Sequence, residues 1–401
     1  IFVSIFVLSY ISLLTSFFFN EDGSGGGAEG DFLITFGFIF ALQDNLLANP
    51  LEWTLVHTPL HFIILSWVAH IIQDAFLLRL IFCIFSIIMI IFFIKCLNFI
   101  TNSNYQNNAL IIASSIFFIP SFRYTSIWAN DLITSLIFFI ISIYFYLKWE
   151  AKKTNKLTLY IYLQIIFLVL ATYTRQYYAV FFVYFLYKYF VALNKAEFYK
   201  LFGYCVLSSL PVFFYVYLFP ELLFGQHISH KAYSYFLLGN TSIISTTLVP
   251  IFFINLFYKK ISLNKEFFYI ILFSTIFVFI LSLGFKPVNW QGGGVNFLLS
   301  NKLLGNNLLF YLTSILTFTV FGIIYKDNKE NIILILILIL MFFSFQVYQR
   351  YYDPMFFLIF FTLFKTNLTK IFFQKIQASI VLLLYYIIYY VVSVTDLIYK
   401  I

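Results

Sequence analysis

The sequence predicts an all-α polytopic membrane protein, and three observations support this fold class. The 401 residues are 62% hydrophobic and only 10% charged, whereas soluble domains carry about 25% charged residues. Apolar runs recur along the whole chain, and runs of about 20 residues are long enough to cross a hydrocarbon core of about 30 Å. Runs such as 332–343 lack the alternation of polar and apolar residues that a transmembrane β-barrel requires. We therefore predict one integral-membrane domain over residues 1–401.

Apolar segments follow one another with short connections between them. They cover residues 1–19, 59–77, 79–99, 108–120, 130–148, 158–173, 176–193, 201–219, 241–258, 267–284, 306–325, 332–347, 355–364 and 376–395. Lysines gather in alternate connections, within 148–156, 188–200, 259–265, 326–329 and 365–375. Because positively charged residues mark cytoplasmic loops, these connections are assigned to the cytoplasm. The connections between them then lie on the extracytoplasmic side.

Residues 20–61 are predicted to form a large first extracytoplasmic loop, which holds six of the sixteen carboxylates and no Lys or Arg. Counting back from the lysine loops places Lys95 in the cytoplasm, so an odd number of crossings must separate it from this loop. Two apolar segments lie between them, so only one of the two can cross the membrane. The first, 59–77, carries four groups that are costly against lipid: His61, His70, Gln73 and Asp74. We therefore predict a re-entrant or interfacial helix at 59–77, short interfacial helices in the loop, and about 13 transmembrane helices.

The arginines distinguish the two faces of the predicted protein. The cytoplasmic loops use lysine alone, whereas Arg123, Arg175 and Arg350 all fall on the extracytoplasmic side. Arginine suits planar, multi-donor recognition of phosphate or carboxylate better than lysine does. The extracytoplasmic face is therefore the predicted working face.

Three carboxylates on this face are candidate catalytic residues. Asp31 follows a glycine-rich stretch, and a carboxylate at the membrane surface can accept a proton from a substrate hydroxyl. Glu29 is the second candidate, and Asp131 at the head of an apolar span is the third. For Asp31 and Asp131 the alternative is a helix cap that satisfies free backbone N–H groups.

Six further residues are candidate substrate-binding residues: His57, His61, Arg175, Gln176, Arg350 and Tyr351. A snorkelling arginine at the membrane surface is the alternative for Arg175, and a structural role is the alternative for Arg350. Pro59 lies between the two histidines and makes a regular helical pair of metal ligands unfavourable, so no metal site is predicted. The histidines at 227 and 230 and the glycine-rich stretch 290–294 are interpreted mainly as solvated or mobile loops.

The order of these features resembles the GT-C superfamily of integral-membrane glycosyltransferases. The matching pieces of the first half are GDF at 30–32, HTPLHF at 57–62, LLRLIF at 77–82 and the span 124–147 with Asp131 at its outer end. Within the superfamily, TYTRQYYAVFF at 172–182 is similar to the Arg-Gln hairpin of α-1,2-glucosyltransferases, and RYYDP at 350–354 to an Arg-Tyr before a late outer loop. There is also some similarity to the protein mannosyltransferase and aminoarabinose transferase group. Two departures are that Glu29-Gly30-Asp31 replaces the usual acidic pair, and that Pro59 is the one proline of the motif that usually has two.

The resemblance implies transfer of a sugar from a polyprenyl-phosphate-linked donor to a glycan, lipid or protein acceptor on the extracytoplasmic or lumenal side. It implies a multi-pass protein of the bacterial inner membrane or the ER membrane, in contact with the lipid bilayer and with no nucleic-acid partner. It assigns no definite cofactor beyond the lipid-linked sugar that serves as donor substrate, and a divalent metal stays open. The alternatives are an envelope polysaccharide polymerase or ligase of the O-antigen type and, third, a transporter. Transporters usually carry internal repeats and ionisable groups near the midplane, and the sequence shows neither.

Overall fold

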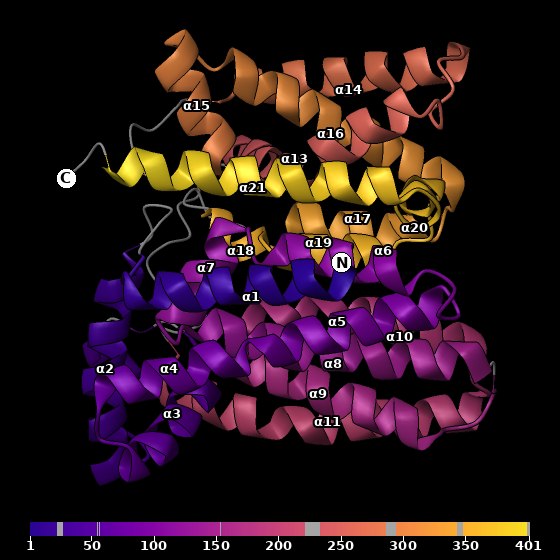
Figure 1. The fold of residues 1–401 in the computed structure, drawn as a ribbon. Coiled ribbons are helices and arrows are strands. Elements are labelled where there is room, and N and C mark those ends of the chain that lie inside the picture. The colour runs from indigo at the N-terminus through magenta and orange to yellow at the C-terminus, as the bar shows by residue number, and fades with distance from the viewer. Residues whose placement is uncertain are drawn as a thin grey trace.

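A computed structural model describes residues 1–21, 27–53, 55, 57–152, 154–220, 233–285, 294–342 and 348–398. His227, His230 and residues 290–293 lie outside this described part. The described residues form helices and contain no strand (Figure 1). The predicted all-α class is therefore confirmed.

Seven helical segments of the described chain are long and apolar enough to cross a membrane. The helices in them are α4 (Ala75–Phe85) with α5 (Ile87–Ile100), α8 (Asp131–Lys152), α11 (Lys195–Leu218), α13 (Tyr233–Phe257), α14 (Lys265–Leu283), α16 (Leu308–Asp327) and α21 (Ile376–Ile398). Two bent pairs raise the number to nine if each pair is one span. One joins α6 (Gln106–Ile116) to α7 (Pro120–Ile127) at 69°; the other joins α18 (Gln349–Tyr352) and α19 (Met355–Thr362) to η3 (Asn367–Thr369) and α20 (Lys370–Gln374) at 99°.

The other helices are shorter or less apolar. They are α1 (Phe2–Phe18), α2 (Ala28–Asp44), η1 (Pro50–Trp53), α3 (Leu60–Ile71), α9 (Leu159–Thr174), η2 (Gln176–Val180), α10 (Phe181–Ala192), α15 (Gly294–Leu304) and α17 (Asn331–Leu340). Several of the predicted crossings correspond to these short helices. The predicted count of about 13 crossings is therefore not confirmed.

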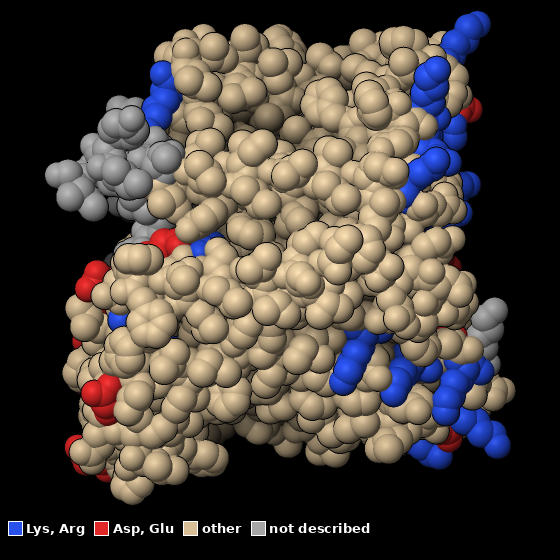
Figure 2. All heavy atoms as spheres, viewed as in Figure 1, with Lys and Arg blue, Asp and Glu red and all other residues tan. Residues whose placement is uncertain are grey.

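The surface of the long helices is that of a membrane protein. Large apolar side chains such as Phe213 and Tyr217 on α11 and Phe273 and Phe279 on α14 are more than 60% exposed. Exposed apolar surface on this scale needs a cover, and lipid supplies it. Figure 2 shows a broad uncharged band between one end where positively charged side chains gather and an opposite end with acidic side chains. We call these the lysine-rich end, which includes Lys188, Lys326 and Lys365, and the acidic end, which includes Asp31 and Glu52.

The predicted re-entrant or interfacial segment 59–77 consists of α3, a break and the start of α4. Helix α3 has 12 residues and at about 1.5 Å per residue is shorter than a hydrocarbon core of about 30 Å. It packs on α2, and both lie at the acidic end of the bundle (Figure 1). Asp74 caps α4 by accepting a hydrogen bond from the Leu77 backbone at 2.8 Å. The length of α3 fits a segment that does not cross, and its depth in a membrane stays a prediction.

Helices α8 and α9 form an antiparallel pair that brings two charged residues together. In the buried contact between the helices, the Ser142 hydroxyl donates to the Gln164 carbonyl and the Gln164 amide donates to Ser142, each at 3.0 Å. Asp131 begins α8 and Arg175 directly follows α9. The distances along the chain, from 131 to 142 and from 164 to 175, are equal. Because both helices rise by about 1.5 Å per residue, the two charged residues reach the same level.

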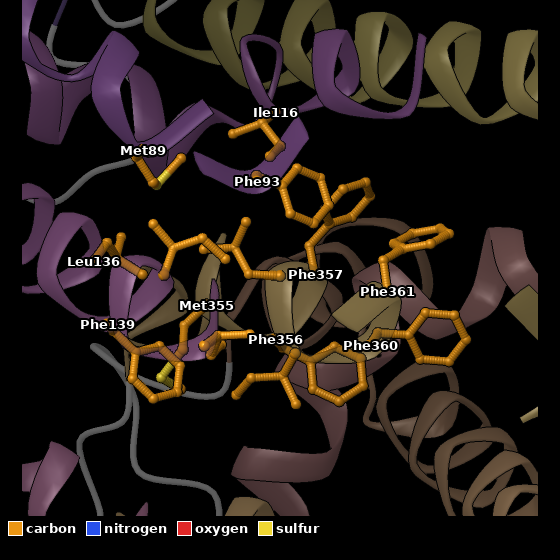
Figure 3. Packing of buried hydrophobic residues seen from close by; sticks show 14 of the residues in the cluster. Met89, Phe93, Ile116, Leu136, Phe139, Met355, Phe356, Phe357, Phe360 and Phe361 are labelled. Carbon is orange, nitrogen blue, oxygen red and sulfur yellow. The ribbon is translucent and has the colours of Figure 1, made fainter. Parts of the chain in front are cut away.

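Helix α19 lies inside the bundle and fixes the short helix α18 that precedes it. All eight residues of α19 are buried. The Phe357 ring lies 5.9 Å from Phe93 of α5 and 5.4 Å from Tyr386 of α21, within a cluster of aromatic and aliphatic side chains (Figure 3). On α18 the Tyr352 hydroxyl donates to the Leu338 carbonyl at 2.5 Å. Arg350 and Tyr351, both on α18, are therefore held by a rigid part of the core.

Candidate functional site

A buried ion pair joins Arg175 to Asp131 at the adjacent ends of α8 and α9. Arg175 Nη2 lies 2.5 Å from Asp131 Oδ1, and the two side chains are 2% and 5% exposed. The Asn130 side chain, rather than Asp131, accepts a hydrogen bond from the Leu132 backbone at the start of α8. Asp131 is therefore available to Arg175, and the helix dipole also favours a carboxylate at this position. A snorkelling role does not fit an arginine that is buried in the protein and paired with a carboxylate.

Arg175 keeps hydrogen-bonding capacity beyond this pair. Its Nε and Nη1 are buried and have no hydrogen-bond partner within the described residues, and the same holds for Asp131 Oδ2. The rings of Tyr177 and Tyr351 each lie with their centres 5.9 Å from the Arg175 guanidinium carbon. Buried donors without acceptors cost free energy. The arrangement therefore favours a ligand that brings anionic oxygen atoms to Arg175.

His57 and Gln176 lie in the same cluster. His57 Nε2 is 4.0 Å from Asp131 Oδ2, and Gln176 is close enough to influence the protonation of His57. Burial lowers the pKa of His57 to about 4, and the positive charge of Arg175 acts in the same direction against the opposing effect of Asp131. The imidazole is therefore neutral near pH 7 and serves as a hydrogen-bonding group rather than a cation.

His61 lies next to this cluster and is fully buried. One ring nitrogen is 2.9 Å from the Thr134 hydroxyl, and the other is 3.0 Å from the Ala129 carbonyl. Both nitrogens are thus occupied by protein groups on either side of Asp131. In this geometry His61 supports the start of α8 and has no ring nitrogen left for a substrate.

A second ion pair, between Arg350 and Asp31, joins α18 to the first turn of α2. Arg350 Nη1 lies 2.7 Å from Asp31 Oδ2, and the side chains are 13% and 41% exposed. The residue at the cap position of α2 is Gly27, and the Asp31 backbone N–H donates to the Gly27 carbonyl at 2.9 Å. The Asp31 side chain therefore pairs with an arginine instead of capping the helix.

Tyr351 connects the two ion pairs. Its ring centre lies 5.9 Å from the Arg175 guanidinium carbon and 6.0 Å from that of Arg350, and its ring stacks on Phe342 at 5.0 Å. Both guanidinium groups are thus arranged around one aromatic ring. The structure brings together residues from four distant parts of the sequence: Asp31, His57, Asp131, Arg175, Gln176, Arg350 and Tyr351.

Glu29 stands apart from this cluster. Its side chain is exposed, and within the described residues it makes no ion pair. No group of three or more His, Cys, Asp or Glu side chains in the described part of the chain is placed to hold a metal ion. The carboxylates within the cluster are Asp31 and Asp131.

Two arginines outside the cluster tether the beginning of the first loop. Arg123 is fully buried, and its Nε lies 3.3 Å from the Glu21 carboxylate. The Arg79 guanidinium carbon lies 3.4 Å from the centre of the Trp128 ring, and Arg79 Nη2 donates to Asn20 Oδ1 at 2.9 Å. These contacts explain why arginines occur at positions 79 and 123 without a ligand.

Asp353 is a buried acid that sequence reasoning did not single out. Its side chain is 2% exposed, and within the described residues no cation lies within 4.0 Å of it. Gln349 Nε2 donates to it at 2.5 Å, and the Thr246 hydroxyl lies 3.4 Å away. Gln349 and Asp353 are four residues apart on either side of Arg350 and Tyr351. This i, i+4 spacing in QRYYD was the available signal.

We expect Asp353→Asn to preserve the position of Arg350 and Asp353→Ala to disturb it. Asparagine retains a carbonyl acceptor for Gln349, whereas alanine leaves the buried Gln349 amide without that acceptor, at a cost of about 1–3 kcal/mol. Thermal unfolding of the purified variants measures the difference. Equal stability of the two variants would contradict a role for the Gln349 contact.

An apolar groove begins next to the cluster. It has a volume of about 200 Å³ and is lined mainly by apolar side chains of α3 with its cap residue Pro59, of α9 and of α11, including Tyr173 and Phe214. Thr58 also lines it, and its hydroxyl donates to the Thr172 carbonyl at 2.9 Å. The groove lining therefore includes Thr58 and Tyr173, which lie within two residues of His57 and Arg175 along the chain. Its other wall is α11, whose apolar side chains are exposed.

Comparisons with known proteins found no relative of this chain. No family model, curated protein or solved structure matches the chain, so a function has to be inferred from the site itself.

Proposed function

We propose that the protein is an integral-membrane glycosyltransferase that moves a sugar from a polyprenyl-phosphate-linked donor to an acceptor hydroxyl. The observation that carries the proposal is the buried Arg175, whose Nε and Nη1 have no partner within the described residues. Arg350 faces the same Tyr351 ring as Arg175, and the lining of an apolar groove includes Tyr173, two residues before Arg175 in the chain. A lipid-linked phosphate combines an anion with an apolar chain and matches both features.

The two parts of such a donor have separate counterparts in the protein. The phosphate oxygens would accept hydrogen bonds from Arg175, and the planar guanidinium can present two N–H groups to one phosphate. The first units of the prenyl chain would lie in the groove lined by Pro59, Tyr173 and Phe214. Burial of apolar chain contributes about 25 cal/mol per Å², so the groove would add to the affinity for the lipid.

The proposed reaction needs a base and a stabilised leaving group. The acceptor oxygen forms a bond to the anomeric carbon of the sugar and loses its proton to the Asp31 carboxylate. The bond between the anomeric carbon and the phosphate oxygen breaks, and its electron pair stays on the phosphate. Arg175 and Arg350 would stabilise the negative charge on this leaving group. Glu29 is the second candidate for the base, and Asp131 would hold Arg175 in place.

The finer features of the fold belong to this proposal. The arrangement would be GT-C-like, with about 13 crossings and with α2 and α3 as interfacial helices of the first loop. The acidic end would face the extracytoplasmic side, since the lysine-rich end would lie in the cytoplasm. The bacterial inner membrane is the proposed location and the ER membrane the alternative. The acceptor is a glycan, a lipid or a protein, and the use of a divalent metal stays open.

Transfer can be measured in native membranes, which supply the acceptor. Membranes containing the protein receive undecaprenyl-phosphate-linked hexoses and pentoses, and release of undecaprenyl phosphate is followed. We expect release with the wild type and a loss of about 100-fold or more with Asp31→Asn, because loss of a general base typically costs this much. Asp44→Asn is the matched control, since Asp44 is an exposed carboxylate at the other end of α2. Wild-type release by Asp31→Asn would remove Asp31 from the mechanism, and no release with any donor would contradict glycosyl transfer.

A further inference from the structure

We propose that Arg350 holds Asp31 inactive until the donor phosphate displaces it, so that donor binding itself releases the base. This inference rests on the proposed function and adds a regulatory step to it. The ion pair at 2.7 Å is the starting state. While Asp31 Oδ2 accepts a hydrogen bond from Arg350 Nη1, that oxygen is not available to take the proton of an acceptor hydroxyl.

The two ion pairs of the site differ in how easily they can exchange. Asp131 and Arg175 are 5% and 2% exposed, and breaking a buried pair leaves an uncompensated charge. Asp31 is 41% exposed, so a freed Asp31 carboxylate would be hydrated. Arg350 is 13% exposed, so this pair is open to solvent on the Asp31 side and is easier to break than the fully buried pair. An incoming anion would therefore displace Asp31 from Arg350 and leave the Asp131–Arg175 pair intact.

The start of α2 gives Asp31 room to move. Gly27 at the cap has φ +64°, and neither Gly27 nor Gly30 has a neighbouring atom within 4 Å of the position that a Cβ would occupy. The first turn of α2 is therefore loosely surrounded on these sides. Asp131, by contrast, begins a helix whose next five residues are all buried. The packing therefore lets Asp31 leave its arginine when an anion binds, whereas Asp131 stays in place.

The exchange gives the reaction an order. Before the donor binds, the two arginines and the two carboxylates compensate one another. The donor phosphate takes the place of Asp31 on Arg350, and the released carboxylate lies next to the phosphate-linked sugar. Asp31 can then accept the proton of the acceptor hydroxyl. The base becomes available only when there is a sugar to transfer.

The exchange predicts opposite effects of Asp31→Asn on binding and on transfer. Farnesyl phosphate is the probe, farnesol is its uncharged control, and binding to the purified full chain in lipid nanodiscs is measured. Asp31→Asn removes the competing charge, so we expect it to bind farnesyl phosphate about fivefold more tightly, which corresponds to one exposed ion pair. Its affinity for farnesol should not change. The same variant loses transfer.

A double-mutant cycle tests whether the tighter binding of farnesyl phosphate by Asp31→Asn depends on Arg350. In a background of Arg350→Met, the change Asp31→Asn should no longer tighten binding of farnesyl phosphate. Asp44→Asn should leave binding unchanged, and thermal unfolding shows that each variant is folded. If the wild type prefers farnesyl phosphate to farnesol but Asp31→Asn binds it no more tightly, the exchange is wrong and the phosphate site stands. If the wild type binds both probes equally, the phosphate site and the exchange are both wrong.

Discussion

Replacing Arg175 with Lys is expected to reduce transfer about 100-fold or more, although the positive charge is kept. A lysine ammonium can pair with Asp131 but cannot also place the two N–H groups that Arg175 presents without a partner in the described residues. The loss should therefore appear in the rate of release of undecaprenyl phosphate from the lipid-linked donor. Because the pair with Asp131 is kept, the unfolding temperature should change little.

Arg123→Lys is the matched control for this experiment. Arg123 is also a fully buried arginine with a carboxylate partner, but it lies outside the cluster. We expect Arg123→Lys to lower the unfolding temperature while transfer per folded molecule stays close to that of the wild type. Equal loss of transfer per folded molecule in Arg123→Lys and Arg175→Lys would show that the loss does not depend on membership of the cluster. The special role of Arg175 would then be refuted.

The second large effect concerns stability. Asp131→Asn leaves the Arg175 charge buried without its counter-ion, and we expect it to destabilise the protein by about 3–5 kcal/mol. The double replacement Asp131→Leu with Arg175→Met removes both charges and should recover most of this stability, because well-packed apolar residues often replace a buried ion pair without loss. The double variant should nevertheless show no transfer. Unfolding of the purified single and double variants provides the measurement, and additive losses would argue against a coupled pair.

The sequence predicts the broad arrangement because it depends on composition and on the sides of the loops. The lysine loops assign Asp31, Asp131, Arg175 and Arg350 to one face, and the structure gathers these four residues at one end of the bundle. Helix lengths were less predictable. The predicted apolar segment 108–120 ends at the bend between α6 and α7, and Pro120 begins a helix in a stretch that was predicted to be a connection.

The partners within the site could not be read from the sequence. Asp31 and Arg350 are 319 positions apart, so their pairing depends on how the tertiary fold brings the first turn of α2 to α18. His61 has the residue type and position of a substrate ligand, but the packing of α3 on α8 directs both of its nitrogens to protein groups. Tyr351 was predicted beside Arg350, whereas its position between two arginines follows from the rigid placement of α18.

The equal spacing along α8 and α9 also limits how this protein can diverge. A single residue inserted between Asp131 and Ser142 would turn Asp131 about 100° around the helix axis, because an α-helix has about 3.6 residues per turn. The carboxylate would then point away from Arg175. An insertion between Lys152 and Leu159, the ends of the two helices, leaves the pair unchanged. Homologous chains that share the chemistry should therefore differ in length in this connection and keep the length of both helical segments.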